Sequence, residues 1–188
     1  IYGALGHSVS DLEHGVKGKE KGVVVRASIQ SIKKGIKGTP GEKIGVFVND
    51  QWRGSIAMNG TFGIFGSLEQ EVDNNLLPDQ LKVATISQVK TGAAKMYTVI
   101  DGEKIESFDI NIVKLMPNYK SAGKGMIVEV VDKDLLSRTG GIIQGMSGSP
   151  IVQDGKLVGA VSHVFVNDPT RGYACFSEWM IEEAGLID

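Results

Sequence analysis

The chain has 188 residues, 41% of them hydrophobic and 22% charged, and a formal net charge of -2. A chain of this length can bury the core of one domain or of one two-lobed unit. The near-neutral charge gives no electrostatic footprint for nucleic acid, and no apolar run approaches the roughly 20 residues of a membrane span. We therefore expect no nucleic-acid partner and no membrane contact by this domain.

Short β-branched runs between turn residues predict an all-β fold, and glycine occurs 25 times against 5 prolines. Asp101-Gly102 and Asp154-Gly155 each predict a two-residue hairpin turn. The expected strands occupy residues 22–32, 43–48, 54–58, 63–68, 82–89, 95–100, 104–115, 125–131, 150–153 and 157–166.

One C-terminal helix is expected over residues 177–184, with Ser177 as its N-cap and Gly185 as its stop. Residues 132–138 could hold one further helical turn. Many short strands with a single terminal helix favour a sandwich or a pair of closed barrels over any βαβ design.

The segment Gly145-Met146-Ser147-Gly148-Ser149-Pro150 has the Gly-x-Ser-Gly-x-Pro pattern with which trypsin-like folds present a nucleophilic serine. Its glycines allow a tight backbone, and the amides of Gly145 and Ser147 could converge as an oxyanion hole. The alternative is a plain glycine-rich turn before a strand. The nucleophile elbow of α/β-hydrolases fits less well, because Ser149 stands where that elbow has its last glycine.

A serine nucleophile needs a base, and the chain has three histidines, His7, His14 and His163. Trypsin-like folds run His, Asp, Ser along the chain, so the base is expected upstream of Ser147. His7 ends a short apolar stretch and is favoured over His14, which reads as an exposed turn residue. His163 alternates with apolar neighbours and is expected in a core or groove wall.

Substrate peptides add as an extra strand in this mode of recognition, and the strand over 157–166 follows the serine turn. Ser162, His163 and Val164 are therefore candidate substrate-binding residues, the alternative being that they line the second core. The histidines show no metal-ligand pairing, so neither a metal nor another cofactor is expected.

The chain resembles the SpoIVB peptidases, sporulation-specific serine endopeptidases of endospore-forming bacteria. The resemblance covers nearly the whole chain and is carried by Ala4-Leu5-Gly6-His7 with Ser10-Asp11, Pro40-Gly41-Glu42-Lys43, Phe62-Gly63-Ile64-Phe65-Gly66, Thr98-Val99-Ile100-Asp101, and a C-terminal block from Thr139-Gly140-Gly141 through the serine turn and His163-Val164-Phe165-Val166-Asn167-Asp168-Pro169 to Glu178-Trp179-Met180.

This resemblance implies a single peptidase domain over residues 1–188, a trypsin/chymotrypsin-like double β-barrel whose lobes meet at about residues 90–120. It places the family's catalytic histidine on His7, its nucleophile on Ser147 and its acid on Asp132. Trypsin-like barrels usually keep the acid in the first lobe, whereas Asp132 lies close to the serine. Asp134 and Asp11 remain alternatives.

The resemblance further implies a protein substrate, a membrane-associated regulator in sporulation signalling, together with self-cleavage. The implied location is extracytoplasmic, between the forespore and mother-cell membranes. The family carries an upstream membrane anchor and a PDZ domain, so this domain alone is expected to lack their localisation and regulation. The rival interpretation is a non-catalytic β module that binds a partner through the groove.

Enzymes activated by cleavage carry an aspartate directly before the serine, where it receives the new N-terminus. Met146 occupies that position here. We therefore expect that the free amine of Ile1 is not required for activity.

Overall fold

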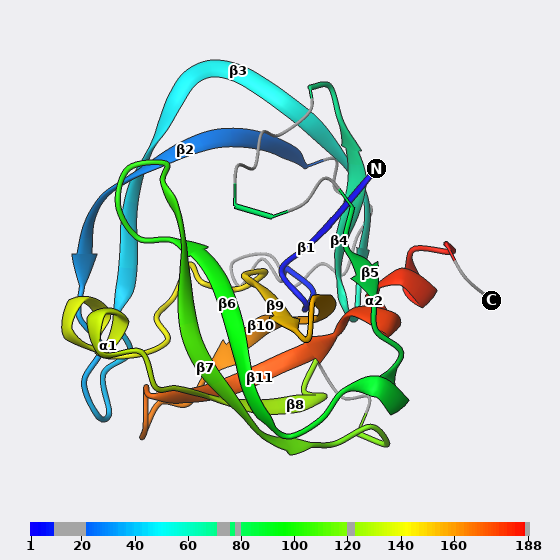
Figure 1. Cartoon of the computed structure of the whole chain (residues 1–188). Coiled ribbons are helices and arrows are strands. Elements are labelled where there is room, and N and C mark those ends of the chain that lie inside the picture. The colour runs from blue at the N-terminus through cyan, green and yellow to red at the C-terminus, as the bar shows by residue number, and fades with distance from the viewer. Residues whose placement is uncertain (10–21, 71–75, 78–79, 120–122, 187–188) are drawn as a thin grey trace.

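The computed structural model describes residues 1–9, 22–70, 76–77, 80–119 and 123–186, and within them the chain forms two β-sheets (Figure 1). The first sheet is antiparallel with the strand order β1-β4-β3-β2. Its two long strands, β2 and β3, arch together over one end of the molecule (Figure 1). The bounds are β1 (Tyr2–Ala4), β2 (Val23–Lys33), β3 (Glu42–Gly60) and β4 (Gly63–Leu68).

The second sheet closes on itself into a barrel. Its strands follow the order β11-β8-β7-β6-β9-β10, and β10 pairs back onto β11, while β5 adds in parallel to β10. The bounds are β5 (Lys82–Val83), β6 (Gly92–Val99), β7 (Ile105–Leu115), β8 (Met126–Val130), β9 (Pro150–Gln153), β10 (Lys156–Val164) and β11 (Arg171–Phe176). Closure removes the free strand edges that an open sheet would expose.

The barrel is filled by the alternating side chains of its strands, as the period of two along a strand requires. Phe108, Ile110 and Ile112 of β7 point inward and are buried, as are Met96 of β6 and Ile151 of β9. This core positions the strand ends from which the site residues project.

Two short helices complete the fold. Helix α1 (Lys133–Thr139) follows β8 and ends at Gly140, which adopts a left-handed φ of 76°. Helix α2 (Ser177–Glu183) follows β11 and holds the two lobes together, because the Glu183 carboxylate accepts hydrogen bonds from the amides of Thr61 (2.8 Å) and Phe62 (2.7 Å). Neither helix, nor any other in the described part of the chain, is long and apolar enough to cross a membrane.

The structure confirms the all-β class of the double-barrel peptidases and the short C-terminal helix. The sheets divide between Leu68 and Lys82, ahead of the boundary expected at 90–120. The N-cap of α2 is Phe176 rather than Ser177, whose hydroxyl donates instead to the Leu157 carbonyl at 2.9 Å.

Several element boundaries differ from the sequence prediction. Residues 43–48 and 54–58 belong to one strand, β3, and only Lys82–Val83 of the expected strand over 82–89 is extended, the rest forming a 3-10 turn at Ile86–Gln88. Strands β1 and β11 were not predicted. The turn at Asp154-Gly155 is confirmed, but Val99 pairs with Ile105, so the loop at Asp101-Gly102 is longer than two residues.

Candidate active site

The serine turn leads from α1 to β9 and is fixed from both lobes. Gly145 and Gly148 have φ values of 89° and 84°, a left-handed conformation that glycine adopts without strain. Met146 points into the barrel core and is fully buried, which anchors the middle of the turn. The Gln144 amide donates to Gly41 of the first lobe at 2.8 Å, and Lys43 donates back to Gln144 at 3.0 Å.

Two amides of this turn, on either side of the bonded Met146 amide, form no hydrogen bond with the described residues. Among the described residues, the amides of Gly145 and Ser147 have no hydrogen-bond partner, while the other amides of the turn donate to carbonyl oxygens: Gln144 to Gly41, Met146 to Ile143, Gly148 to Val161 and Ser149 to Met146. Donors that flank a serine and bond to nothing else are the requirement for an oxyanion hole.

The Ser147 hydroxyl is held by the neighbouring strand. Ser147 Oγ donates to the main-chain carbonyl of Ser162 on β10 at 2.9 Å. The pairing of β10 with β11 shifts register between Val161 and His163, so Ser162 lies at an irregularity of the strand. Its own hydroxyl is buried and donates to the Gly123 carbonyl at 2.9 Å. Ser162 therefore contacts Ser147 through its main chain.

His7 is presented by a sharp reversal at the end of β1. Leu5 and Gly6 both have positive φ (74° and 69°), and the Gly6 amide donates to Ala4 at 3.0 Å. A Cβ atom added to Gly148 would lie 2.7 Å from the Leu5 nitrogen. The reversal before His7 therefore packs directly against the turn that carries Ser147.

The ring of His7 has a defined tautomer. Its Nδ1 lies 2.8 Å from the Ser8 carbonyl oxygen. A carbonyl can only accept, so Nδ1 carries the hydrogen and Nε2 keeps its lone pair. This is the tautomer that a general base needs, with Nε2 available for a proton.

His163 lies beside His7, with their ring centroids 4.9 Å apart. Its Nδ1 is buried and has no hydrogen-bond partner among the described residues. Burial lowers the pKa of His163, and the neighbouring charges of His7 and Lys124 lower it further. Val164, the next residue of β10, is partly buried and pairs with Gly172.

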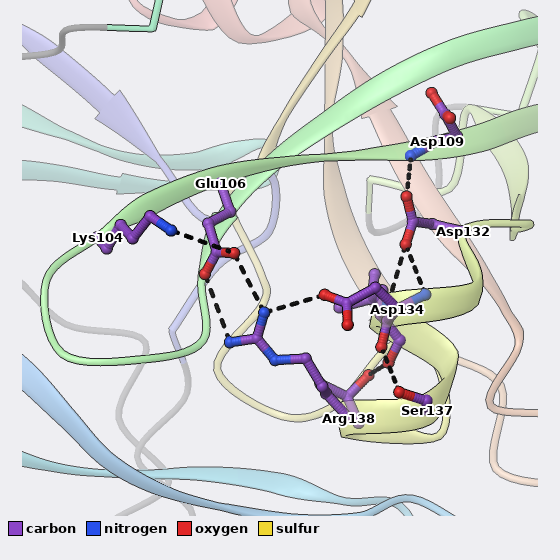
Figure 2. Close-up of polar contacts among 9 residues, drawn as sticks. Lys104, Glu106, Asp109, Asp132, Asp134, Ser137 and Arg138 are labelled. Atoms are coloured by element: carbon purple, nitrogen blue, oxygen red, sulfur yellow. Dashed lines mark hydrogen bonds and ion pairs between the residues drawn. The ribbon is translucent and has the colours of Figure 1, made fainter.

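Asp132 caps helix α1 (Figure 2). Its Oδ1 accepts from the amides of Asp134 and Leu135, both at 3.0 Å, and its Oδ2 accepts from the Asp109 amide at 3.2 Å. These contacts do not include His7, and the role of Asp132 as triad acid stays a prediction.

The alternatives to Asp132 are placed differently. Asp134 pairs with Arg138 at 3.1 Å, and the same guanidinium bonds Glu106 (Figure 2). Asp11 and His14 lie outside the described residues. Within the described ranges, no three His, Cys, Asp or Glu side chains group together as metal ligands would.

Sequence reasoning missed Lys43. It follows Glu42 at the start of β3 and reads in the sequence as one of a pair of surface charges. The fold instead brings its stem against Gly145, where a Cβ atom would lie 3.2 Å from it. Burial lowers the pKa of Lys43 to about 8.

A closed β-barrel, a second β-sheet and a glycine-bounded serine turn between them define the class of the double-barrel peptidases. Comparison with known families agrees, because the family described as SpoIVB peptidase S55 matches residues 1–181. The chain belongs to the SpoIVB peptidase family. It is therefore a peptidase, a hydrolase that acts on protein substrates. A search of curated proteins finds no match.

Proposed function

We propose that the chain is a serine endopeptidase in which Ser147 is the nucleophile and His7 the general base. The observation that carries this proposal is the pair of unbonded amides at Gly145 and Ser147, in a turn whose other amides are all bonded. Both residues line the cleft beside the turn, so their amides are open to a substrate oxygen. In an oxyanion hole each such donor typically contributes about 100- to 1,000-fold in rate.

The reaction would follow the acyl-enzyme route. Ser147 Oγ attacks the scissile carbonyl while His7 Nε2 takes its proton, and the two free amides stabilise the resulting oxyanion. His7 then donates the proton to the leaving amine, and water repeats the sequence on the acyl-enzyme. The hydroxyl must first rotate away from the Ser162 carbonyl, to which it donates at 2.9 Å.

The family resemblance supports Asp132 as the acid of the triad. In that role it would orient His7 and stabilise its charged form. The carboxylate would have to leave the helix cap, while the Ser8 carbonyl currently holds Nδ1 of His7 at 2.8 Å. The two roles of Asp132 are separable by mutation.

The peptide substrate would add to β10 as a further strand. β9 pairs with β10 only from Lys156 to Ala160, and β11 covers the other edge as far as Val164. His163 and Val164 are thus paired with a described strand on one side only, and Ser162 lies at the irregularity just before them. Main-chain bonds along this segment would give affinity and the neighbouring pockets specificity.

The family supports a role in sporulation signalling, with cleavage of a membrane-associated regulatory protein and self-cleavage. The corresponding location is extracytoplasmic, between the forespore and mother-cell membranes of an endospore-forming bacterium.

Labelling with a fluorophosphonate tests the proposed chemistry. We expect the label on Ser147, identified by peptide mass spectrometry, and its loss in Ser147→Ala and His7→Ala. Ser137→Ala is the control, because Ser137 is an exposed serine whose hydroxyl bonds only within α1. Labelling that survives both site mutations would exclude the mechanism. A folded chain that takes no label would instead favour a non-catalytic module that binds its partner through the groove.

A further inference from the structure

A cleft of about 300 Å³ opens beside the serine turn. It is lined by Gly145 and Ser147 to Pro150 of the turn, by Tyr97, Val99 and Ile105 of the barrel, and by Lys43 of the first lobe. Among the described residues that line the cleft, Lys43 is the single formal charge. A substrate side chain near the scissile bond would meet this charge.

Lys43 is held in place at both ends. Its stem packs against Gly145, and its main-chain amide donates to Gln144. Its Nζ donates to Thr98 Oγ1 at 2.9 Å, and the same oxygen accepts from the Ser149 hydroxyl at 2.9 Å. The ammonium is thereby fixed next to the turn rather than free to swing into solvent.

No carboxylate of the described residues neutralises the charge of Lys43. Among the described residues no acidic side chain forms an ion pair with it, and the adjacent Glu42 pairs with Lys33 at 3.1 Å. An ammonium has three donors, and Thr98 takes one of them. A half-buried cation with no counter-charge among the described residues is costly to maintain, which is typical of sites where the charge serves a ligand.

We infer that Lys43 is a specificity-determining residue whose ammonium binds the carboxylate of an aspartate or glutamate side chain of the substrate, close to the scissile bond. This inference rests on the proposed function and assigns it a substrate class. A carboxylate would accept from donors of Lys43 that no described residue uses, and it would supply a counter-charge that the described residues lack. Charge-assisted hydrogen bonds of this kind are about twice as strong as neutral ones. An asparagine or glutamine in the same place would bond more weakly.

The test is cleavage of a proteome-derived peptide library by the purified chain, with cleavage sites read by mass spectrometry. We expect aspartate and glutamate to be enriched at one position within a few residues of the cut. A matched pair of peptides that differ only by Asp or Asn at that position should then differ in kcat/KM by about 10- to 100-fold.

Variants of Lys43 test whether this residue causes the preference for acidic side chains. In Lys43→Met the ratio between the two peptides should fall to near 1, whereas Lys43→Arg should retain a preference for the acid. Lys33→Met is the matched control, because Lys33 is an exposed lysine of the same sheet, and its ratio should equal that of wild type. If Lys43→Met does not fold, Lys43→Gln replaces it.

The outcome separates this inference from the proposed function. Fluorophosphonate labelling of Ser147 reports the nucleophile with a probe that carries no carboxylate. If Ser147 is labelled and the library is cut, but without preference for acidic residues or with the same preference in Lys43→Met, the inference is overturned and the serine mechanism stands. If Ser147→Ala still cuts the library, the serine mechanism itself fails.

Discussion

The Ser147 hydroxyl donates to the main-chain carbonyl of Ser162 at 2.9 Å. A carbonyl oxygen cannot accept a proton for catalysis, so the proposed nucleophile is held in an orientation that does not serve the reaction. The same carbonyl belongs to the segment of β10 where the substrate strand is proposed to add. Substrate main-chain bonds in this segment would compete for the bond to Ser147. We therefore expect peptide binding to favour rotation of the hydroxyl toward His7.

The close packing of Gly148 against Leu5 yields a first prediction. Alanine at 148 would place its Cβ 2.7 Å from the Leu5 nitrogen and push the His7 segment away. We expect Gly148→Ala to lower kcat/KM by at least about 100-fold, the effect of a displacement of about 1 Å at a catalytic group. Peptide hydrolysis measures the rate, and urea unfolding measures stability.

Gly155→Ala is its control. Gly155 also has a positive φ, of 72°, but nothing lies within 4 Å of an added Cβ atom. We expect it to lose about 1 to 2 kcal/mol of stability from the left-handed conformation alone and to keep full activity. Equal losses of activity in the two variants would show that strain, not displacement of His7, is responsible.

Two variants distinguish the helix-capping role of Asp132 from its proposed role as the triad acid. Asn caps a helix as well as Asp, whereas Ala does not, so Asp132→Ala should cost about 1 kcal/mol of unfolding free energy and Asp132→Asn much less. If Asp132 is the triad acid, turnover should also fall roughly 10,000-fold in Asp132→Asn. Unchanged turnover in this well-folded variant would leave Asp132 with the cap alone. Asp134→Asn should change turnover little.

The buried Lys43 makes stability depend on alkaline pH. Its pKa in the folded chain is about 8, against 10.5 for a free lysine. Between these values the unfolded chain binds more protons, so stability rises with pH across the window from about 8 to about 10.5, by up to about 3 kcal/mol. Urea unfolding from pH 7.5 to 10.5 should show this rise in wild type. A rise of the same size in Lys43→Met would assign it elsewhere.

The lowered pKa of His163 acts at acid pH. Below the unfolded value of about 6.5 the unfolded chain takes up the proton first, so stability falls as the pH drops from about 6.5 through the folded pKa. His163→Phe removes this group and the buried Nδ1 without a partner. We expect its unfolding free energy to fall less than that of wild type between pH 7 and 5. Parallel curves would contradict this.

The sequence predicted the elements whose signals are local. The strand over 63–68, the hairpin at Asp154-Gly155 and the C-terminal helix have their own periodicity or turn chemistry. β1 is only three residues long, too short to show any period. The loop at Asp101-Gly102 is enlarged because Gly102 bridges to Ile29 of the other sheet, a contact between residues remote in sequence.

The same distinction applies to the site. The glycines around Ser147 predict the turn from the sequence alone, and the motif indicates which two amides, those of Gly145 and Ser147, could form an oxyanion hole. The role inferred for Lys43 depends on the contact between β3 and the serine turn. No residue next to Lys43 in the chain indicates that it lies against Gly145. Asp132 is ambiguous in sequence for a physical reason, because an aspartate before a short helix suits a cap and a catalytic acid equally.

The short strand β1 also bears on how often the site is intact. It is an edge strand of three residues, paired only with β4, and it carries the segment that ends in His7. Such a strand is the least costly part of a sheet to open, because opening breaks few bonds and leaves the barrel intact. Fraying of β1 would thus remove the base without unfolding the protein. The fraction of competent enzyme would then be set by a local equilibrium, visible as fast amide exchange in β1 against slow exchange in β7.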